Sequence, residues 1–263
     1  MLNSFEGVNI LNDRELMLTV RIFRTDEQGA GYWATYQVSV DEKMSVLDVI
    51  TKIQRKEDPT LAYRYSCRAG MCGTCAMRVN GKNRWTCRTQ VANLKSGTLT
   101  IEPLPHFPVL RDLAVDMEPF FERHRKIVDR FVPVEPDRKG FAVIPQLSRE
   151  RREINEHVEC ITCGSCFASC GVVNSSSEYL GPAALNRAWV LIADSRDAAG
   201  GERLDILNSR DGVWSCHTQF NCSDACPVGL SPARAIQKLK RKEVRHAFSR
   251  IFSLGRTKQT TRG

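Results

Sequence analysis

The sequence predicts an α+β protein with two domains, a small mixed domain followed by a domain built from helices. Apolar and polar residues alternate in residues 16–24 and 32–40, which is the period of a half-buried strand. Three prolines fall within residues 102–108, where they interrupt regular structure. Beyond this segment the apolar spacing becomes helical. We therefore expect domains at residues 1–108 and 109–263.

Local signals place the elements of the first domain. Ser45 and Asp48 have the spacing of a capping box that starts a helix. Asn80-Gly81 lies between short apolar segments and is typical of a type I′ hairpin turn. A last strand is expected after Gly97. The residues expected to share the apolar face of their strand or helix are Leu16, Leu18, Val20, Ile22, Tyr32, Ala34, Tyr36, Val38, Val40, Val46, Val49, Ile50, Ile53, Leu99 and Ile101.

Helix signals dominate the second domain. Apolar residues between Leu113 and Val128 predict one or two helices, and a further helix is expected to run up to Cys160. The expected helix starts are Pro119, Ser148, Gly181-Pro182 and Ser231-Pro232, the last helix running through Phe252. The cysteines of this half are expected in the turns between helices.

Cysteine is the residue type that stands out in this chain. No apolar run approaches the roughly 20 residues that a spanning helix needs, and the N-terminus lacks the pattern of a secretory signal. We therefore expect the chain to stay in the cytoplasm, where thiols are kept reduced. Eleven cysteines, gathered in three groups, are then expected to be metal ligands and not disulfides.

The net charge of +8 is a property of the tail. Residues 234–263 hold ten Lys or Arg and one acid, whereas residues 1–233 hold 28 basic and 29 acidic groups. A basic tail suits an anionic membrane surface or an acidic partner at least as well as nucleic acid. We therefore expect no nucleic-acid partner.

The first cysteine group has the spacing of a plant-type [2Fe–2S] site. Cys67-x4-Cys72-x2-Cys75 is followed, after eleven residues, by Cys87. A loop that wraps three thiolates around two irons needs small residues, and the loop supplies them. They are Ala69, Gly70, Gly73 and Thr74. The alternative, a structural zinc site, prefers two well-separated short pairs.

Positive charge surrounds this group, since residues 59–101 hold seven basic residues and no acid. These are Arg64, Arg68, Arg78, Lys82, Arg84, Arg88 and Lys95. Positive charge stabilises a reduced cluster, so we expect a potential above the roughly −400 mV of plant-type ferredoxins. The alternative is a solvated or docking surface.

The second and third groups form a matched pair. Cys160-x2-Cys163-x2-Cys166-x3-Cys170 is the bacterial ferredoxin run, in which the fourth cysteine ligates the cluster of the other run. The matching run begins at Cys216. Its remaining positions are Gln219, Cys222 and Cys226, followed by Pro227. Because the fourth cysteine of each run ligates the cluster of the other, we expect a [4Fe–4S] cluster at Cys160, Cys163, Cys166 and Cys226.

The other site of the pair lacks one thiolate. It has Cys170, Cys216 and Cys222, and its fourth position is Gln219. A glutamine amide is a poor ligand for iron bound to sulfide, so we expect a [3Fe–4S] cluster. Three clusters without a nucleotide loop, flavin motif or catalytic triad predict an electron carrier whose donor and acceptor lie on other molecules.

Several segments resemble the iron–sulfur subunit of succinate dehydrogenase or fumarate reductase, respiratory complex II. They are the loop SCRAGMCGTCAMRVNG, the linker IEPLPHFPVLRDLAVDM, the two later cysteine runs and CPVGLSPARAIQ. The resemblance spans about residues 16–242. It implies a β-grasp ferredoxin domain followed by an α-helical ferredoxin domain. It also implies a flavoprotein partner that oxidises succinate at FAD, and membrane anchor subunits that bind quinone and often haem.

The resemblance further implies a peripheral position at the cytoplasmic face of the inner membrane, and electron flow from FAD to quinone. His217 occupies the position of a family histidine near the quinone, and Gln219 follows it closely; a structural histidine is the alternative. The family often has a tryptophan pair after the fourth cysteine of the first run, whereas no tryptophan follows Cys170 until Trp189. A haem or a differently built quinone site is therefore an alternative acceptor.

The last helix is expected to be basic and amphipathic. Its apolar residues are Val244, Phe248, Ile251 and Phe252, surrounded by Lys240, Arg241, Lys242, Arg245 and Arg250. Such a helix suits a membrane surface or the anchor subunits, and a solvated terminal helix is the alternative. For the whole chain, the alternatives are a quinol:fumarate reductase subunit running in reverse, a thiol-dependent fumarate reductase and a free multi-cluster carrier.

Overall fold

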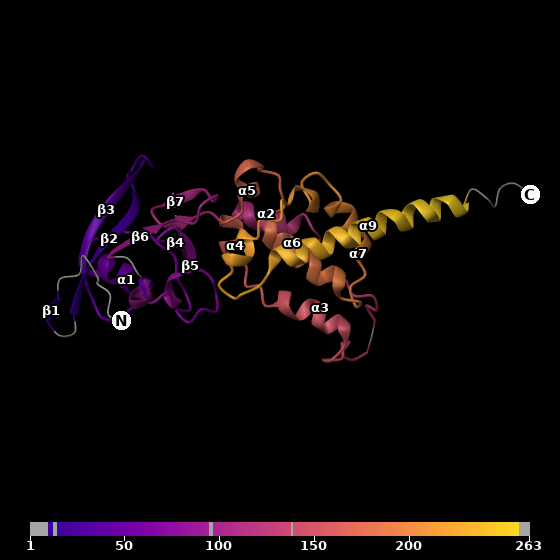
Figure 1. The fold of residues 1–263 in the computed structure, drawn as a ribbon, viewed down its shortest axis with the longest axis horizontal. Coiled ribbons are helices and arrows are strands. Elements are labelled where there is room, and N and C mark those ends of the chain that lie inside the picture. The colour runs from indigo at the N-terminus through magenta and orange to yellow at the C-terminus, as the bar shows by residue number, and fades with distance from the viewer. Residues whose placement is uncertain (1–9, 13–14, 95–96, 138, 258–263) are drawn as a thin grey trace, which may run out of the picture. The chain divides into compact units, whose positions relative to one another are not determined.

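A computed structural model describes residues 10–12, 15–94, 97–137 and 139–257 (Figure 1). The side chains of Lys95, Ile251 and Phe252 lie outside the described part. The chain forms two compact units. The first comprises Met1–Glu118 and Ile161–Ser169, and the second comprises Pro119–Cys160 and Cys170–Gly263.

A mixed sheet is the centre of the first unit. Its strands run in the order β1-β2-β6-β4-β5, with β3 also paired to β2. The strand β2 is antiparallel to β3 and parallel to β6. The bounds are β1 (Ile10–Asn12), β2 (Glu15–Thr25), β3 (Gly31–Val40), β4 (Ala76–Val79), β5 (Lys82–Trp85), β6 (Thr98–Glu102), β7 (Val109–Arg111) and β8 (Ala114–Val115). The helices are α1 (Val46–Lys56), α4 (Ser165–Ala168), η1 (Thr86–Arg88) and η2 (Val91–Asn93).

The helix α1 packs its apolar face on this sheet, and its predicted start is confirmed. The Ser45 hydroxyl accepts from the Asp48 N–H at 3.2 Å, and the Asp48 carboxylate accepts from the Ser45 N–H at 3.0 Å. The buried core residues include Val20, Ile22, Val46, Val49, Ile50, Ile53, Leu99 and Ile101. Burial of such a face supplies most of the stability of a short helix.

The predicted turn at Asn80-Gly81 is also confirmed. Asn80 has φ 46° and Gly81 has φ 75°, as a type I′ turn requires. The turn joins β4 to β5 with Val79 opposite Lys82. It therefore sets the register of the strand that leaves the first cysteine loop.

The prediction that helical structure begins at Leu113 is wrong. Residues 109–115 instead form the two-stranded sheet of β7 and β8, and Leu113 joins the core of the first unit. Asp112, at the turn, has φ 49° and is fully buried. Its carboxylate accepts from the N–H groups of Thr25 and Ala62, each at 2.8 Å. These distant partners hold the segment extended.

The described part of the second unit has helices and no strand, apart from one isolated β-bridge between Pro133 and Asp197. The bounds are α2 (Glu118–Arg125), α3 (Arg149–Val158), α5 (Gly171–Ser175), α6 (Gly181–Ala193), α7 (Gly200–Leu207), η3 (Val213–Ser215), α8 (Asn221–Asp224) and α9 (Pro232–Thr257). The helix α6 is buried along most of its length, and α3, α7 and α9 pack on it. The Ser148 cap is confirmed, since its hydroxyl accepts from the Arg151 N–H at 3.0 Å. Among the described residues, none lies in a helix long and apolar enough to span a membrane.

Three helix boundaries differ by a few residues from those expected. The helix α2 begins one residue before Pro119, α3 ends at Val158 and α9 continues past Phe252 to Thr257. Apolar spacing locates the middle of a helix better than its ends, because terminal residues make few packing contacts.

Replacing Asp112 by Asn tests the link between the β7–β8 segment and the sheet. Asp112 also lies 3.1 Å from the guanidinium of Arg24, and both side chains are buried. Removing one partner of a buried ion pair costs about 3–5 kcal/mol, so we expect the free energy of unfolding of Asp112→Asn to fall by that order in urea titrations.

The control is Glu102→Gln in the same unit. Glu102 pairs with Arg78 at 3.6 Å on the surface, and an exposed pair contributes about 0–1 kcal/mol. Equal losses of stability in the two variants would contradict the role given to Asp112.

Candidate metal centres

The structure places the first four predicted ligands in the first unit, on the loop between α1 and β4 and on η1. They are Cys67, Cys72, Cys75 and Cys87, none of which is in a disulfide. The Cys67 N–H donates to the Cys72 Sγ at 3.5 Å, and the Cys72 N–H donates to the Cys67 Sγ at 3.3 Å. The thiols of Cys75 and Cys67 both act on the Cys87 thiol. The loop thus brings the four thiols together.

Backbone N–H groups of this loop point at sulfur. Those of Ala69, Met71 and Cys72 donate to the Cys67 Sγ at 3.4, 3.3 and 3.3 Å. These hydrogen bonds lower the pKa of the Cys67 thiol to about 6. Burial, with the neighbouring Cys75 thiol, raises the pKa of Cys87 to about 11. N–H donors directed at a thiolate are what a negatively charged iron–sulfur ligand needs.

Left-handed backbone lets the loop curl. Arg68, Gly70 and Gly73 have φ 55°, 74° and 70°. A Cβ on Gly73 would lie 2.5 Å from the Cβ and 3.0 Å from the Cα of Cys163, within the first unit. Only glycine fits at Gly73, because its backbone touches the second cysteine run.

The second and third cysteine runs share a backbone geometry as well as a spacing. In the second run, Thr162 and Gly164 have φ 54° and 81°. In the third, Thr218 and Phe220 have φ 58° and 63°. In each run a four-residue helix follows at once, α4 and α8 respectively. The two runs therefore share their backbone conformation as well as the spacing of their cysteines, and only the spacing was visible in the sequence.

This matching places Gln219 where the second run has Cys163. It likewise places Cys222, in α8, where the second run has Cys166, in α4. Phe220 holds a left-handed conformation that glycine occupies in the other run, which is uncommon for a bulky residue. The third run keeps the shape of a cluster loop and lacks the thiol at one position.

Three predicted ligands surround a hollow in the second unit. Cys170, Cys216 and Cys222 line it, and so do His217 and Gln219. The side chains of His217 and Gln219 are exposed. The Thr218 N–H donates to the Cys216 Sγ at 3.4 Å, which repeats the N–H to sulfur pattern of the first loop.

Of the thiols around this hollow, Cys222 is buried and Cys170 and Cys216 are partly buried, and they interact electrostatically. Burial, together with the neighbouring Cys170 and Cys216 thiols, raises the pKa of Cys222 to about 11. Burial also raises the pKa of Cys170, against the hydrogen bonds of two backbone N–H groups. Neutral thiols are therefore favoured at Cys170 and Cys222 in the free chain, and a cationic metal group would favour their thiolates.

The predicted [4Fe–4S] set is divided between the two compact units. Cys163 and Cys166 belong to the first unit, whereas Cys160 and Cys226 belong to the second. The Asn83 side-chain amide donates to the Ser169 hydroxyl at 2.7 Å, which ties the Cys163 segment to β5 within the first unit. The grouping of these four ligands stays a prediction.

No three His, Cys, Asp or Glu side chains of the described residues converge closely enough to hold a single metal ion. The ligands of an iron–sulfur cluster stand farther apart, because iron and sulfide lie between them.

Three residues near the third run were missed from the sequence. Tyr179 is fully buried, and burial together with the Cys216 thiol raises the pKa of its phenol. Lys240 donates from Nζ to the Cys216 carbonyl at 2.8 Å. Trp214 is exposed two residues before Cys216. Only Trp214 carried a signal, as an aromatic residue beside a ligand; the other two approach the run through tertiary packing.

Comparison with known proteins identifies both parts of the chain. Residues 19–122 match the 2Fe-2S iron-sulfur cluster binding domain, and residues 156–230 match the 4Fe-4S dicluster domain. In structure, the chain is similar to the Mycobacterium smegmatis Sdh1 complex in the apo form, with a TM-score of 0.80 and 27% identity over 88% of this chain and 97% of that chain. The predicted α+β class is confirmed.

Three relatives found by sequence are named as iron–sulfur subunits. The chain is 41% identical to succinate dehydrogenase [ubiquinone] iron-sulfur subunit 1, mitochondrial, of Oryza sativa subsp. japonica, over 76% of this chain and 71% of the relative. It is 40% identical to the succinate dehydrogenase iron-sulfur subunit of Paracoccus denitrificans, over 78% and 79%. It is 33% identical to the fumarate reductase iron-sulfur subunit of Mycobacterium tuberculosis, over 90% and 96%. The chain therefore belongs to the family of iron–sulfur subunits of succinate dehydrogenase and fumarate reductase.

Proposed function

We propose that this chain conducts single electrons between a flavoprotein subunit and quinone through three iron–sulfur clusters. The chain is the electron-carrying subunit of a complex II enzyme, and its two domain matches support [2Fe–2S] and [4Fe–4S] clusters. When bound, such clusters accept and release one electron at a time. No residue of this chain is expected to contact succinate.

The proposed ligands divide the eleven cysteines into sets of four, four and three. Cys67, Cys72, Cys75 and Cys87 hold the [2Fe–2S] cluster. Cys160, Cys163, Cys166 and Cys226 hold the [4Fe–4S] cluster. Cys170, Cys216 and Cys222 hold the [3Fe–4S] cluster, because Gln219 takes the place that a cysteine has in the matched run.

The contact between Gly73 and Cys163 carries this proposal. Gly73 belongs to the first cysteine loop and Cys163 to the second run, yet their backbones leave no room for a methyl group between them. Ligand segments of two proposed clusters therefore touch within one compact unit. Electron transfer needs such proximity, and a chain with unrelated metal sites does not.

Partners are proposed from the relatives. We propose an FAD-containing flavoprotein subunit and membrane anchor subunits that hold the complex at the cytoplasmic face of the inner membrane. His217 and Gln219 are proposed to lie nearest the quinone, since both line the hollow of the third site. The same ligand sets serve succinate oxidation or fumarate reduction, and the relatives carry both names.

The charge around the first loop is partly balanced in the structure. Arg68 pairs with Asp48 at 2.9 Å, and Arg78 pairs with Glu102 at 3.6 Å. Both acids lie outside the acid-free stretch of sequence. The rise in cluster potential proposed from the sequence is accordingly smaller than a count of basic residues indicates.

Purification of the native complex tests the function. We expect the chain to be isolated with a subunit that holds FAD, and succinate to reduce the clusters of that complex, as followed by EPR. Isolation of the chain as a monomer without flavin would instead favour a free electron carrier.

Gln219→Cys tests the third site. A fourth thiolate completes the ligand set of a cubane, so we expect the EPR signal of the oxidised [3Fe–4S] cluster to disappear and the iron content to rise by one atom per chain. Gln219→Ser, which adds no thiolate, should keep the signal. A signal that persists in Gln219→Cys, or is lost equally in Gln219→Ser, contradicts the assignment.

Gly73→Ala tests the contact with Cys163. A methyl group there meets the second run at 2.5 Å, and overpacking costs about 1–3 kcal/mol in addition to the strain of positive φ. We expect lower [2Fe–2S] content by visible absorbance and lower stability in urea. Gly81→Ala is the matched control, because Gly81 has φ 75° and open space around it. Similar losses in both variants would mean that backbone strain alone is responsible.

A further inference from the structure

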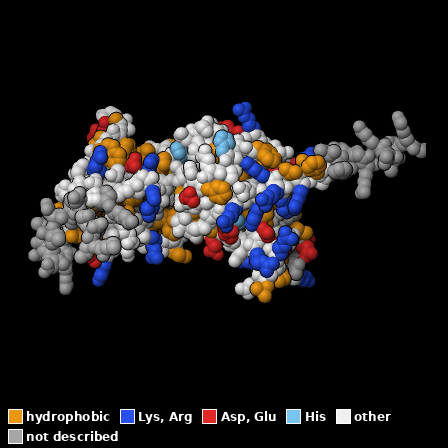
Figure 2. Space-filling view, viewed as in Figure 1, with side chains coloured by type: hydrophobic (Ala, Val, Ile, Leu, Met, Phe, Trp, Pro, Cys, Tyr) orange, Lys and Arg blue, Asp and Glu red, His pale blue; other side chains and the backbone are white. Residues whose placement is uncertain are grey.

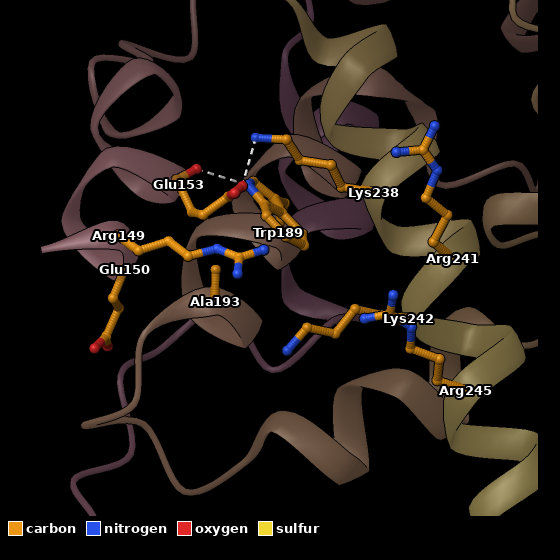
Figure 3. Close-up of a pocket in the computed structure, with 9 residues that line it drawn as sticks. All are labelled: Arg149, Glu150, Glu153, Trp189, Ala193, Lys238, Arg241, Lys242 and Arg245. Atoms are coloured by element: carbon orange, nitrogen blue, oxygen red, sulfur yellow. Dashed lines mark hydrogen bonds and ion pairs between the residues drawn. The ribbon is translucent and has the colours of Figure 1, made fainter.

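A basic groove lies between α3, α6 and α9 in the second unit, away from the described ligands. It has a volume of about 510 Å³, which is in the range of small-ligand sites. In Figure 3 the cations of α9 stand on one side, and Arg149, Glu150 and Glu153 of α3 stand on the other. Trp189 and Ala193 of α6 lie between them.

The cations of α9 in this groove share one helical face. Lys238, Arg241, Lys242 and Arg245 are spaced i, i+3, i+4 and i+7. Figure 2 shows Lys and Arg side chains gathered over this part of the surface. Five cations and two carboxylates line the groove, with Arg149 as the fifth cation.

The two carboxylates are already engaged. Glu153 pairs with Lys238 at 2.8 Å, and this hydrogen bond lowers the pKa of Glu153. Glu150 accepts from the Ser195 N–H. In the described part of the chain, no hydrogen bond or ion pair is made by the side chains of Arg149, Arg241, Lys242 and Arg245. Four positive charges are therefore available to an anion from outside.

Apolar side chains flank these cations on α9. Val244 and Phe248, one turn apart, are 45% and 57% exposed, and they border Arg241 and Arg245 on the helix. Two other cations of the helix already have partners: Lys240 donates to the Cys216 carbonyl, and Arg250 pairs with Asp205 on the surface. The outward face thus combines free cations with exposed apolar surface.

We propose that this groove binds the headgroup of an anionic phospholipid at the membrane surface. Arginine forks match phosphate oxygens, and a helix with cations beside apolar residues is suited to the lipid interface. An acidic protein segment would satisfy the cations without using Val244 and Phe248. The inference goes beyond electron transfer and does not depend on the cluster assignments.

Vesicle binding by the full, cluster-loaded chain tests the proposal. We expect stronger binding to vesicles that contain phosphatidylglycerol than to vesicles of phosphatidylcholine alone. Each basic residue near an anionic surface contributes appreciably, so Arg241→Gln/Arg245→Gln should weaken binding about tenfold. Phe248→Ala should weaken it as well.

The matched control is Arg210→Gln/Arg234→Gln, which removes the same charge from exposed arginines of the second unit outside the groove. It should bind vesicles as the unaltered chain does, and all variants should keep their cluster EPR spectra. Equal weakening in the control would show that net charge alone acts, and would overturn the proposal. The proposal would also be overturned if the groove arginines bound inorganic phosphate while the chain bound both types of vesicle equally well. If Arg241→Gln/Arg245→Gln left vesicle binding unchanged but the chain lost its partner subunits on purification, the groove would bind a protein, and the proposal would be overturned.

Discussion

The close approach of two cysteine segments is the constraint on which the rest of the structure depends. Gly73 must lack a side chain because Cys163 lies against it, and it must adopt positive φ because the loop curls there. The sheet fixes the loop through β4, and Asn83 fixes the second run through Ser169. The first unit therefore includes Ile161–Ser169, although these residues follow the helix α3 of the second unit.

The third run keeps the backbone conformation of the second run, although Gln219 stands where the second run has Cys163. Its backbone retains left-handed residues at Thr218 and Phe220, although Phe220 has a large side chain. Such a conformation costs about 1–2 kcal/mol without glycine. In this conformation Cys216 and Cys222, on either side of Phe220, line one hollow. The loop shape is thus consistent with the proposal that these thiols share a cluster.

Features set by near neighbours in sequence were predictable. The capping box at Ser45 and the turn at Asn80 are signalled by residues within three positions, and both are as expected. The segment around Asp112 was not predictable, because its hydrogen bonds reach Thr25 and Ala62, 87 and 50 residues away. Its apolar spacing therefore indicated a helix that tertiary hydrogen bonds exclude.

The same distinction holds at the metal centres. Cysteine spacing predicted the ligand sets, and it is strongest for thiols on one loop because these lie close in sequence. It did not show Tyr179 beside Cys216 or Asp48 beside Arg68, since these neighbours come from other elements. Charge counted along the sequence therefore overestimates charge at the site, whereas the proposed iron ligands could be predicted from their spacing.

Mössbauer spectroscopy of the native complex, grown with isotopically enriched iron, tests the central claim most directly. The account predicts three spectral components per chain, with the parameters of a [2Fe–2S], a [4Fe–4S] and a [3Fe–4S] cluster. Spectra that show two cluster types only, or zinc bound in place of iron on elemental analysis, would contradict it.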